Sequence, residues 1–196
     1  GVTAIGESAF GRTGITSITI PEGVTTIGRR AFAYTDIASV TIPASVTSIV
    51  LQGDDNSFYN CPLLTGINVA PGNASFAGVD GVLYGKSGSV LAAALYCPSA
   101  KTGSHTIPSG VTNIGYAFSG SSLTSITIPN GVESIGDSAF YGCSWLTSIT
   151  IPTLVESIGE DAFYGCAALA SVAFPEGLTS IGPYAFYGCT SLASIT

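Results

Sequence analysis

Apolar and polar residues follow a fixed period along most of this chain. In Leu123–Trp145, apolar side chains fall at positions 1, 4, 6, 10 and 13, and an Ala-Phe pair follows at positions 17 and 18. Leu146–Ala168 and Leu169–Ser191 repeat this pattern without a gap, so the period is 23 residues. Self-similarity at such a period predicts a solenoid, in which each coil buries its apolar face against its neighbours.

The first part of each repeat predicts a short β-strand, and the second part predicts turns. Apolar residues at positions 4 and 6 alternate with polar ones, so their side chains share one face of a strand. Pro at position 7 ends that strand, because proline has no backbone N–H to donate. Gly at position 14 allows a turn, and Gly at position 20 suits a left-handed backbone conformation. The Ala-Phe pair is expected on a short helical turn.

Weaker copies of the repeat occupy most of the remaining chain. Ile15–Asp36 is one copy, and Ile37–Leu63 is a longer one with an insertion around residues 53–56. Asn60 stands in this copy where the regular repeats have the left-handed Gly, and Asn tolerates that conformation better than most residues. Phe recurs at one position of the repeat, and we expect a buried column of Phe10, Phe32, Phe58, Phe118, Phe140, Phe163 and Phe186.

The repeat breaks over residues 64–101. Val82–Tyr84 and Val90–Tyr96 flank the segment Gly85-Lys86-Ser87-Gly88, and two apolar runs around such a turn predict a β-hairpin. The period resumes at Thr102. The break is therefore expected to interrupt the solenoid without ending it.

These segments predict a single solenoid domain over residues 1–196. We expect about seven coils of roughly 22–23 residues, with an irregular hairpin insertion over residues 70–101. The chain starts and stops within a repeat, so we expect it to be a fragment of a longer repeat protein.

The repeat resembles the BspA-like, treponemal-type leucine-rich repeat, whose unit is approximately L-x-x-I-x-I-P-x-x-V-x-x-I-x-x-x-A-F-x-x-C-x-x. The resemblance implies a right-handed leucine-rich-repeat solenoid with short strands and helical or 3-10 turns. It also implies a secreted or surface-anchored bacterial protein that adheres to host matrix proteins or to other cells. We therefore expect a non-enzymatic recognition or adhesion module with a protein partner. The alternative is a structural spacer that presents another domain.

Charge and hydropathy narrow the possible partners. The net charge is −7 with only five Lys and Arg residues, so no basic stripe for nucleic acid is expected. No apolar run of about 18 residues exists, so no membrane insertion is expected. No cofactor is implied, and we expect a monomer.

Four cysteines share position 21 of the repeat: Cys61, Cys143, Cys166 and Cys189. The column predicts a ladder of buried free thiols that bond weakly to loop carbonyls. A disulfide between adjacent coils is geometrically conceivable. The spacing lacks the paired Cys-x-x-Cys of a metal site. Cys97 lies outside the column and is expected to be the most exposed thiol.

No catalytic or metal-binding residue is predicted. His105 is the only histidine and occupies position 4, where other coils have an inward Ile or Val, so we expect a half-buried spacer. Asp54, Asp55 and Asn56 lack the residue order of a calcium loop and are expected to form a polar bulge.

Candidate partner-binding residues are aromatic or lie on the hairpin. A stacked tyrosine stripe suits a protein contact surface, although these rings could simply cover the neighbouring Phe column. Outward positions 3 and 5 carry Ser and Thr and are expected to form a solvated strand face. The candidates are Tyr141, Tyr164, Tyr187, Trp145, Lys86 and Ser87.

Overall fold

The first ladder of the fold comes from the strands that the repeat predicts. The computed structural model describes residues 1–196. In its C-terminal half, Ile126 lies beside Ile149, Ile149 beside Val172, and Val172 beside Ile195 in parallel register. Equal repeat positions therefore stack directly on one another. This sheet consists of β9 (Thr102–Thr106), β11 (Ser122–Thr127), β13 (Ser148–Thr150), β15 (Ser171–Ala173) and β17 (Ser194–Ile195).

A second parallel ladder, which the sequence analysis did not predict, runs along positions 12 and 13. Ser134 pairs with Ser157, and Ile135 pairs with Ile158. Each strand has only two residues, which is too few for an alternation of apolar and polar residues to indicate a strand. The strands are β10 (Asn113–Ile114), β12 (Ser134–Ile135), β14 (Ser157–Ile158) and β16 (Ser180–Ile181). Every regular coil thus contributes one rung to each of two sheets.

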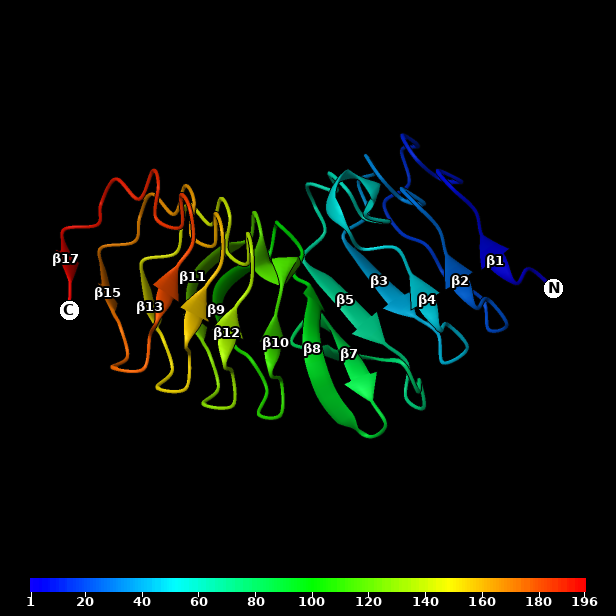
Figure 1. Cartoon of the computed structure of the whole chain (residues 1–196). Coiled ribbons are helices and arrows are strands. Elements are labelled where there is room, and N and C mark those ends of the chain that lie inside the picture. Colours follow the sequence, from blue (N-terminus) through cyan, green and yellow to red (C-terminus); the bar gives the residue numbers. More distant parts are fainter.

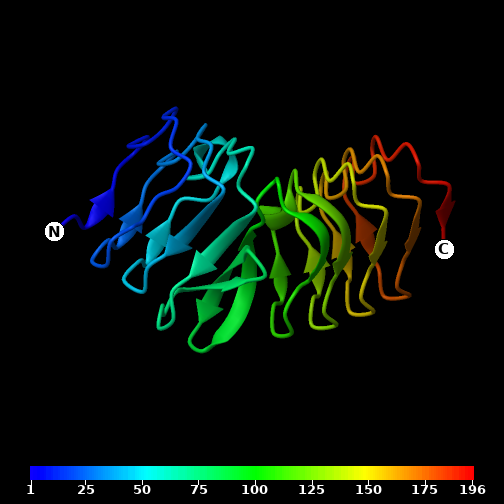
Figure 2. The ribbon, with the colours of Figure 1, turned by 180° about the vertical axis from the view of Figure 1, so that it is seen from behind.

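The N-terminal coils form the same two ladders as separate sheets. The second ladder contains β1 (Ala4–Ile5), β2 (Thr26–Ile27) and β4 (Ser48–Ile49) in parallel. The first ladder contains β3 (Ser39–Ile42) and β5 (Gly66–Val69). We call residues 1–69 the N-terminal stack and residues 102–196 the C-terminal stack. Figures 1 and 2 show the two stacks meeting at the green strands, where the strand direction changes.

The predicted hairpin is present, but residues 85–87, which were expected in its turn, belong to its first strand, and a third strand extends it. The strands β6 (Phe76–Val79), β7 (Val82–Ser87) and β8 (Val90–Tyr96) form an antiparallel meander. On its other side β8 pairs in parallel with β10, so the meander continues the second ladder of the C-terminal stack. The second ladder consists of seven two-residue strands and β8. This agrees with the expected number of about seven coils and one interruption.

The meander separates two hydrophobic cores. Leu83 packs into the core of the N-terminal stack, whereas its neighbours Val82 and Tyr84 pack into the core of the C-terminal stack. On β8, Ala94 packs into the C-terminal core, and Leu95 packs against the N-terminal core. Because successive residues of a strand face opposite sides, one sheet serves as the end wall of both stacks.

The predicted phenylalanine column is confirmed in both stacks. Phe32 lies 5.6 Å from both Phe10 and Phe58 between ring centroids, and Phe140 lies 5.1 Å from Phe163. The break in the column is filled by aromatic rings from the hairpin region and from β9. Tyr96 stacks on Phe58, and His105 lies between Tyr84 and Phe118.

Helical structure is limited to two 3-10 turns, η1 (Gly53–Asp55) and η2 (Tyr116–Phe118). The helical turn expected at Ala-Phe occurs only in η2, and the other coils have hydrogen-bonded turns there. Asn60 has φ of 49°, and Gly142 has φ of 68°, as expected for their repeat position. None of the helical segments has the length and apolar character needed to cross a bilayer.

Replacing Phe140 with Ala should lower the free energy of unfolding by about 3–5 kcal/mol, because its ring is fully buried between two others. Urea denaturation of the variant and the parent chain would measure the loss. The half-exposed neighbour Tyr141 is the control, since Tyr141→Ala should cost clearly less. A loss below about 1 kcal/mol at Phe140 would contradict the assigned register.

Candidate functional site

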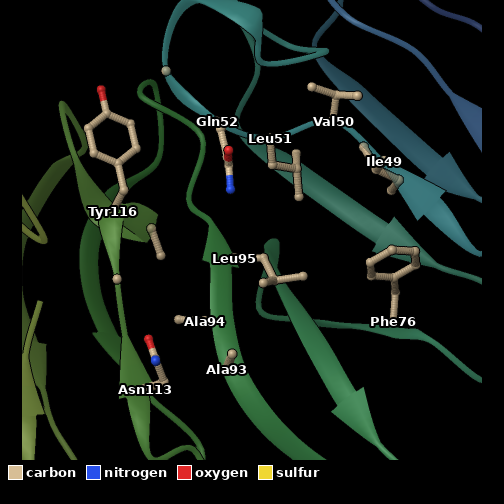
Figure 3. Close-up of a pocket in the computed structure, with 13 residues that line it drawn as sticks. Ile49, Val50, Leu51, Gln52, Phe76, Ala93, Ala94, Leu95, Asn113 and Tyr116 are labelled. Carbon is tan, nitrogen blue, oxygen red and sulfur yellow. The ribbon is translucent and has the colours of Figure 1, made fainter.

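A groove opens where the second ladder is interrupted between the two stacks. The strand β4 pairs only with β2, and β8 pairs with β7 and β10, so β4 and β8 face each other without pairing. The space between them is about 790 Å³ (Figure 3). We call it the junction groove. Its lining consists of residues 49–53, Phe76, residues 93–95, Asn113 and residues 115–117.

Local sequence explains why this space is hollow. β8 presents Ala93 toward the groove, and the opposite bank is formed by Leu51 and Gln52, which lead into the inserted residues (Figure 3). Tyr116 forms the rim on the C-terminal bank, and its side chain is 50% exposed. Small residues on one wall and an insertion on the other therefore leave a gap that no coil fills.

A second cleft of about 350 Å³ extends the groove toward the tyrosine edge of the solenoid. Gly53 and Tyr116 line both spaces, so the cleft adjoins the groove. Tyr59 from the N-terminal stack and Tyr141 from the C-terminal stack face the cleft, with Asn60 at its edge. We call this space the tyrosine cleft.

Neither space is lined by an Asp, Glu, Lys, Arg or His residue. Polar groups come from amides, hydroxyls and the backbone, including Gln52, Asn113 and Ser99. Tyr96 lines the cleft, and burial raises the pKa of its phenol, so it stays neutral. The combined surface can therefore contact apolar groups and hydrogen-bond to neutral ones.

The three tyrosines predicted as contact residues form a stacked column. The ring centroids of Tyr141 and Tyr164 are 4.9 Å apart, and those of Tyr164 and Tyr187 are 5.0 Å apart. Tyr141 is 40% exposed and Tyr187 is 60% exposed, so part of each ring is accessible at the surface. Tyr141 also lines the tyrosine cleft, which joins this tyrosine column to the groove.

The other predicted contact residues lie apart from this surface. Trp145 is 63% exposed on a loop of the C-terminal stack. Lys86 donates a 2.8 Å hydrogen bond from Nζ to the carbonyl of Asn73, so its ammonium is engaged within the chain. Ser87 is exposed at the end of β7. None of the three lines the junction groove or the tyrosine cleft.

Charge is distributed unevenly between the two stacks. All five Lys and Arg residues lie at or before Lys101, whereas residues 102–196 contain six acidic residues and no Lys or Arg. In the N-terminal stack, Arg29 pairs with Asp55 at 2.6 Å and with Glu7 at 3.7 Å. The C-terminal stack has no such ion pair. The acidic residues there are Glu133, Asp137, Glu156, Glu160, Asp161 and Glu176.

The cysteine column forms the expected ladder of free thiols. Cys143 donates to the carbonyl of Phe118 at 3.0 Å, and Cys166 donates to that of Phe140 at 3.2 Å. The prediction for Cys97 is wrong, since this thiol is buried in the C-terminal core. It lies at the end of β8, where side chains alternate into the two cores, and burial raises its pKa to about 12.

The prediction for His105 is also wrong in part, because its side chain is fully buried and hydrogen-bonded at both nitrogens. Nδ1 lies 3.2 Å from Asp80 Oδ2, and Nε2 lies 2.6 Å from the hydroxyl of Tyr84. An ionised carboxylate only accepts, so Nδ1 carries the proton and Nε2 accepts from Tyr84. Lys101 Nζ completes the network at 3.0 Å from Asp80. This network was not predicted, because its residues come from the insertion and from the coil after it.

The His105 network resembles an acid–base relay, but no substrate can reach it. Both His105 and Tyr84 are buried, and the imidazole is covered by the rings of Tyr84 and Phe118. No group of three or more His, Cys, Asp or Glu residues could hold a metal ion. Asp54 and Asp55 lie on η1, where Asp55 binds Arg29. The His105 network accordingly stabilises the junction between the two stacks.

Comparison with known proteins agrees with this architecture. The family model described as BspA type leucine rich repeat region matches residues 1–77 and 92–196 in six copies. The unmatched residues 78–91 contain β7 and its turn, where the chain departs from the coil. No curated protein matches the sequence.

Solved structures of bacterial proteins share the fold. A leucine-rich cell surface protein of Faecalibacterium prausnitzii is 33% identical with a TM-score of 0.72, over 99% of this chain and 57% of that one. A leucine-rich repeat protein of Eubacterium ventriosum is 30% identical with a TM-score of 0.58, over 97% of this chain and 44% of that one. The pneumococcal vaccine antigen PcpA shares the fold at 23% identity and a TM-score of 0.65, over 99% of this chain and 59% of that one. This chain thus spans about half the length of these proteins.

The free energy of unfolding should fall as the pH drops below about 6.5, because the unfolded chain then protonates its histidine. Burial lowers the pKa of His105 in the folded chain, so folding favours the neutral imidazole. The buried imidazole therefore contributes fully to the free energy of unfolding only above about pH 6.5. The carboxyl of Asp80 affects the free energy of unfolding only at lower pH, since Lys101 and His105 lower its pKa.

Urea denaturation at about pH 7.5 and about pH 5.5 tests this dependence, because His105 is the only histidine and carboxyl groups titrate mainly lower. His105→Gln can still hydrogen-bond but cannot titrate, so its unfolding free energy should change less between the two conditions. Greater stability of the parent chain at the lower pH would contradict the assignment.

Proposed function

We propose that this chain, which belongs to the BspA-type leucine-rich repeat family, is a non-enzymatic recognition module of a secreted or surface-displayed bacterial protein. Its partner is a protein of the host matrix or of another cell surface. The placement outside the cell is supported by the similar Faecalibacterium prausnitzii protein, which is described as a cell surface protein. Because the chain spans about half of that protein, the proposal concerns this module alone.

The observation that carries the proposal is the continuous surface formed by the junction groove, the tyrosine cleft and the tyrosine column. Monomeric surfaces rarely expose a long apolar patch without a binding role. Tyrosine is enriched at protein interfaces, because its ring offers apolar area and its hydroxyl offers a hydrogen bond. Tyr116 and Tyr141 belong to this surface and are at least 40% exposed.

A non-enzymatic role is supported by the state of the titratable groups. The imidazole of His105 is sealed from solvent, and burial raises the pKa of the Tyr84 phenol. The thiols of the cysteine column donate to backbone carbonyls of the preceding coils. These groups hold coils together and are not placed around a substrate-sized space.

A spacer that only separates other domains is the second candidate. The regular outward face of the first ladder supports it, since Ser148 and Thr150 stand exposed beside their equivalents on neighbouring coils. Such a face is hydrated and offers no distinctive contact. A spacer does not account for the groove, so recognition is the preferred function.

A binding array of matrix and cell-surface proteins tests the two candidates. Recognition predicts saturable binding of the purified chain to at least one arrayed protein. Simultaneous Tyr141→Ser, Tyr164→Ser and Tyr187→Ser substitution should weaken that binding by about tenfold or more, as expected for loss of aromatic interface anchors. Each variant's thermal unfolding should be recorded as a control for folding.

The matched control is Ser125→Ala with Ser148→Ala, which alters the outward face of the first ladder and should leave binding unchanged. Absence of binding to every arrayed protein would favour the spacer. Equal loss in both variants would point to a surface other than the tyrosine column.

A further inference from the structure

We infer that the junction groove binds an extended apolar segment of the partner protein, and that lysine or arginine residues flank this segment. This inference rests on the proposed recognition function and specifies the site and the chemistry of its ligand. It follows from three independent properties: the apolar lining, an unpaired strand edge on one bank and unneutralised carboxylates beside the other bank.

The lining requires an apolar occupant. Ile49, Leu51, Phe76 and Leu95 contribute aliphatic and aromatic surface, and Ala93 leaves room for an incoming side chain (Figure 3). The groove has no charged lining residue and a volume of about 790 Å³, within the range of ligand sites. A charged side chain placed there would lose its hydration without gaining a counter-ion.

The unpaired edge of β4 favours an extended occupant. The amides of Ser48 and Val50 bond to β2 at the carbonyls of Thr25 and Ile27. Alternate peptide groups of a strand point to opposite edges, so the peptide groups of Ile49 face the groove side. No strand pairs with β4 there. An extended segment can add to such an edge through main-chain hydrogen bonds while its side chains enter the groove.

The opposite bank requires a positive flank. On this bank β8 is followed by β10, β12 and β14 in parallel register. Glu133 and Glu156 immediately precede β12 and β14, and Asp137 and Glu160 follow them after one glycine. None of these carboxylates lies in an ion pair, because the C-terminal stack has no Lys or Arg. These carboxylates therefore form two rows, before and after the strands, that begin one coil from the groove. Neither row has a Lys or Arg partner within the C-terminal stack.

Charge complementarity thus distinguishes the partner from a second copy of this chain. A second copy would bring a further net charge of −7 toward an already acidic protein. A basic segment would be attracted instead, and the attraction would decrease with salt because exposed charges are screened.

The probe for the test is a fluorescein-labelled peptide of five alternating Leu and Thr residues followed by four Lys residues. Two matched peptides carry Glu in place of Lys, or Ser in place of Leu. Fluorescence anisotropy should show saturable binding of the first peptide. Binding of each matched peptide should be at least about tenfold weaker, and binding of the first should weaken with added salt.

Variants of the protein locate the site. Ala93→Trp fills the groove and should abolish peptide binding. Tyr116→Ser removes a half-exposed residue at the rim and should weaken peptide binding. This second variant keeps the test valid if Ala93→Trp does not fold. Glu133→Gln with Glu156→Gln and Glu160→Gln should reduce both affinity and salt dependence. Asp36→Asn removes an exposed carboxylate outside the groove and should change nothing.

Equal binding of the Lys and Glu peptides, or unchanged binding to Ala93→Trp and Tyr116→Ser, would overturn the inference. Dimerisation of the parent chain that Ala93→Trp abolishes in sedimentation velocity would also overturn it, since a second copy would then occupy the groove. If the parent chain does not bind the peptide and array binding persists in Ala93→Trp, only this inference fails. Absence of array binding would instead remove the proposed recognition function.

Discussion

Each coil of this protein can bury its apolar side chains only against the coil before it and the coil after it. A single coil has too few residues to enclose a core, so Phe140 depends on Phe118 and Phe163 for its burial. Parallel pairing in both ladders enforces this dependence, because it places equal repeat positions directly above one another. The stability of any coil is therefore shared with its neighbours, and any departure from the period must supply a substitute surface.

The hairpin region supplies that substitute at the middle of the chain. Tyr96 takes the place of a phenylalanine beside Phe58, and His105 does so beside Phe118. Because strands expose alternate side chains on opposite faces, β7 and β8 can close two cores at once. The polar atoms that this solution buries are all hydrogen-bonded, including the hydroxyl of Tyr84. The groove results from the same arrangement, since the meander continues the second ladder of the C-terminal stack and leaves one edge of β4 in the N-terminal stack without a strand partner.

Sequence reasoning succeeded where structure depends on the repeat and failed where it depends on contacts between distant segments. The phenylalanine column and the left-handed Asn60 follow from positions within the period, and the hairpin follows from two apolar runs where the period breaks. The second ladder was missed because its two-residue strands carry no alternation. The groove joins Ile49 to Ala93, which no local pattern relates. The burial of Cys97 likewise depends on how β8 is shared between two cores. The tyrosine column was visible in the sequence, but its continuity with a cleft required the structure.

The absence of lysine and arginine from the C-terminal stack also affects how the protein meets proteases. Every lysine and arginine lies at or before Lys101, so an enzyme that cleaves after basic residues has no site within residues 102–196. Lys101 itself is held against Asp80 with little of its side chain exposed. The C-terminal stack is therefore inherently resistant to trypsin-like digestion, by composition as well as by compactness. The tyrosine column, which lies wholly within this stretch, would thus stay on one intact fragment after such cleavage.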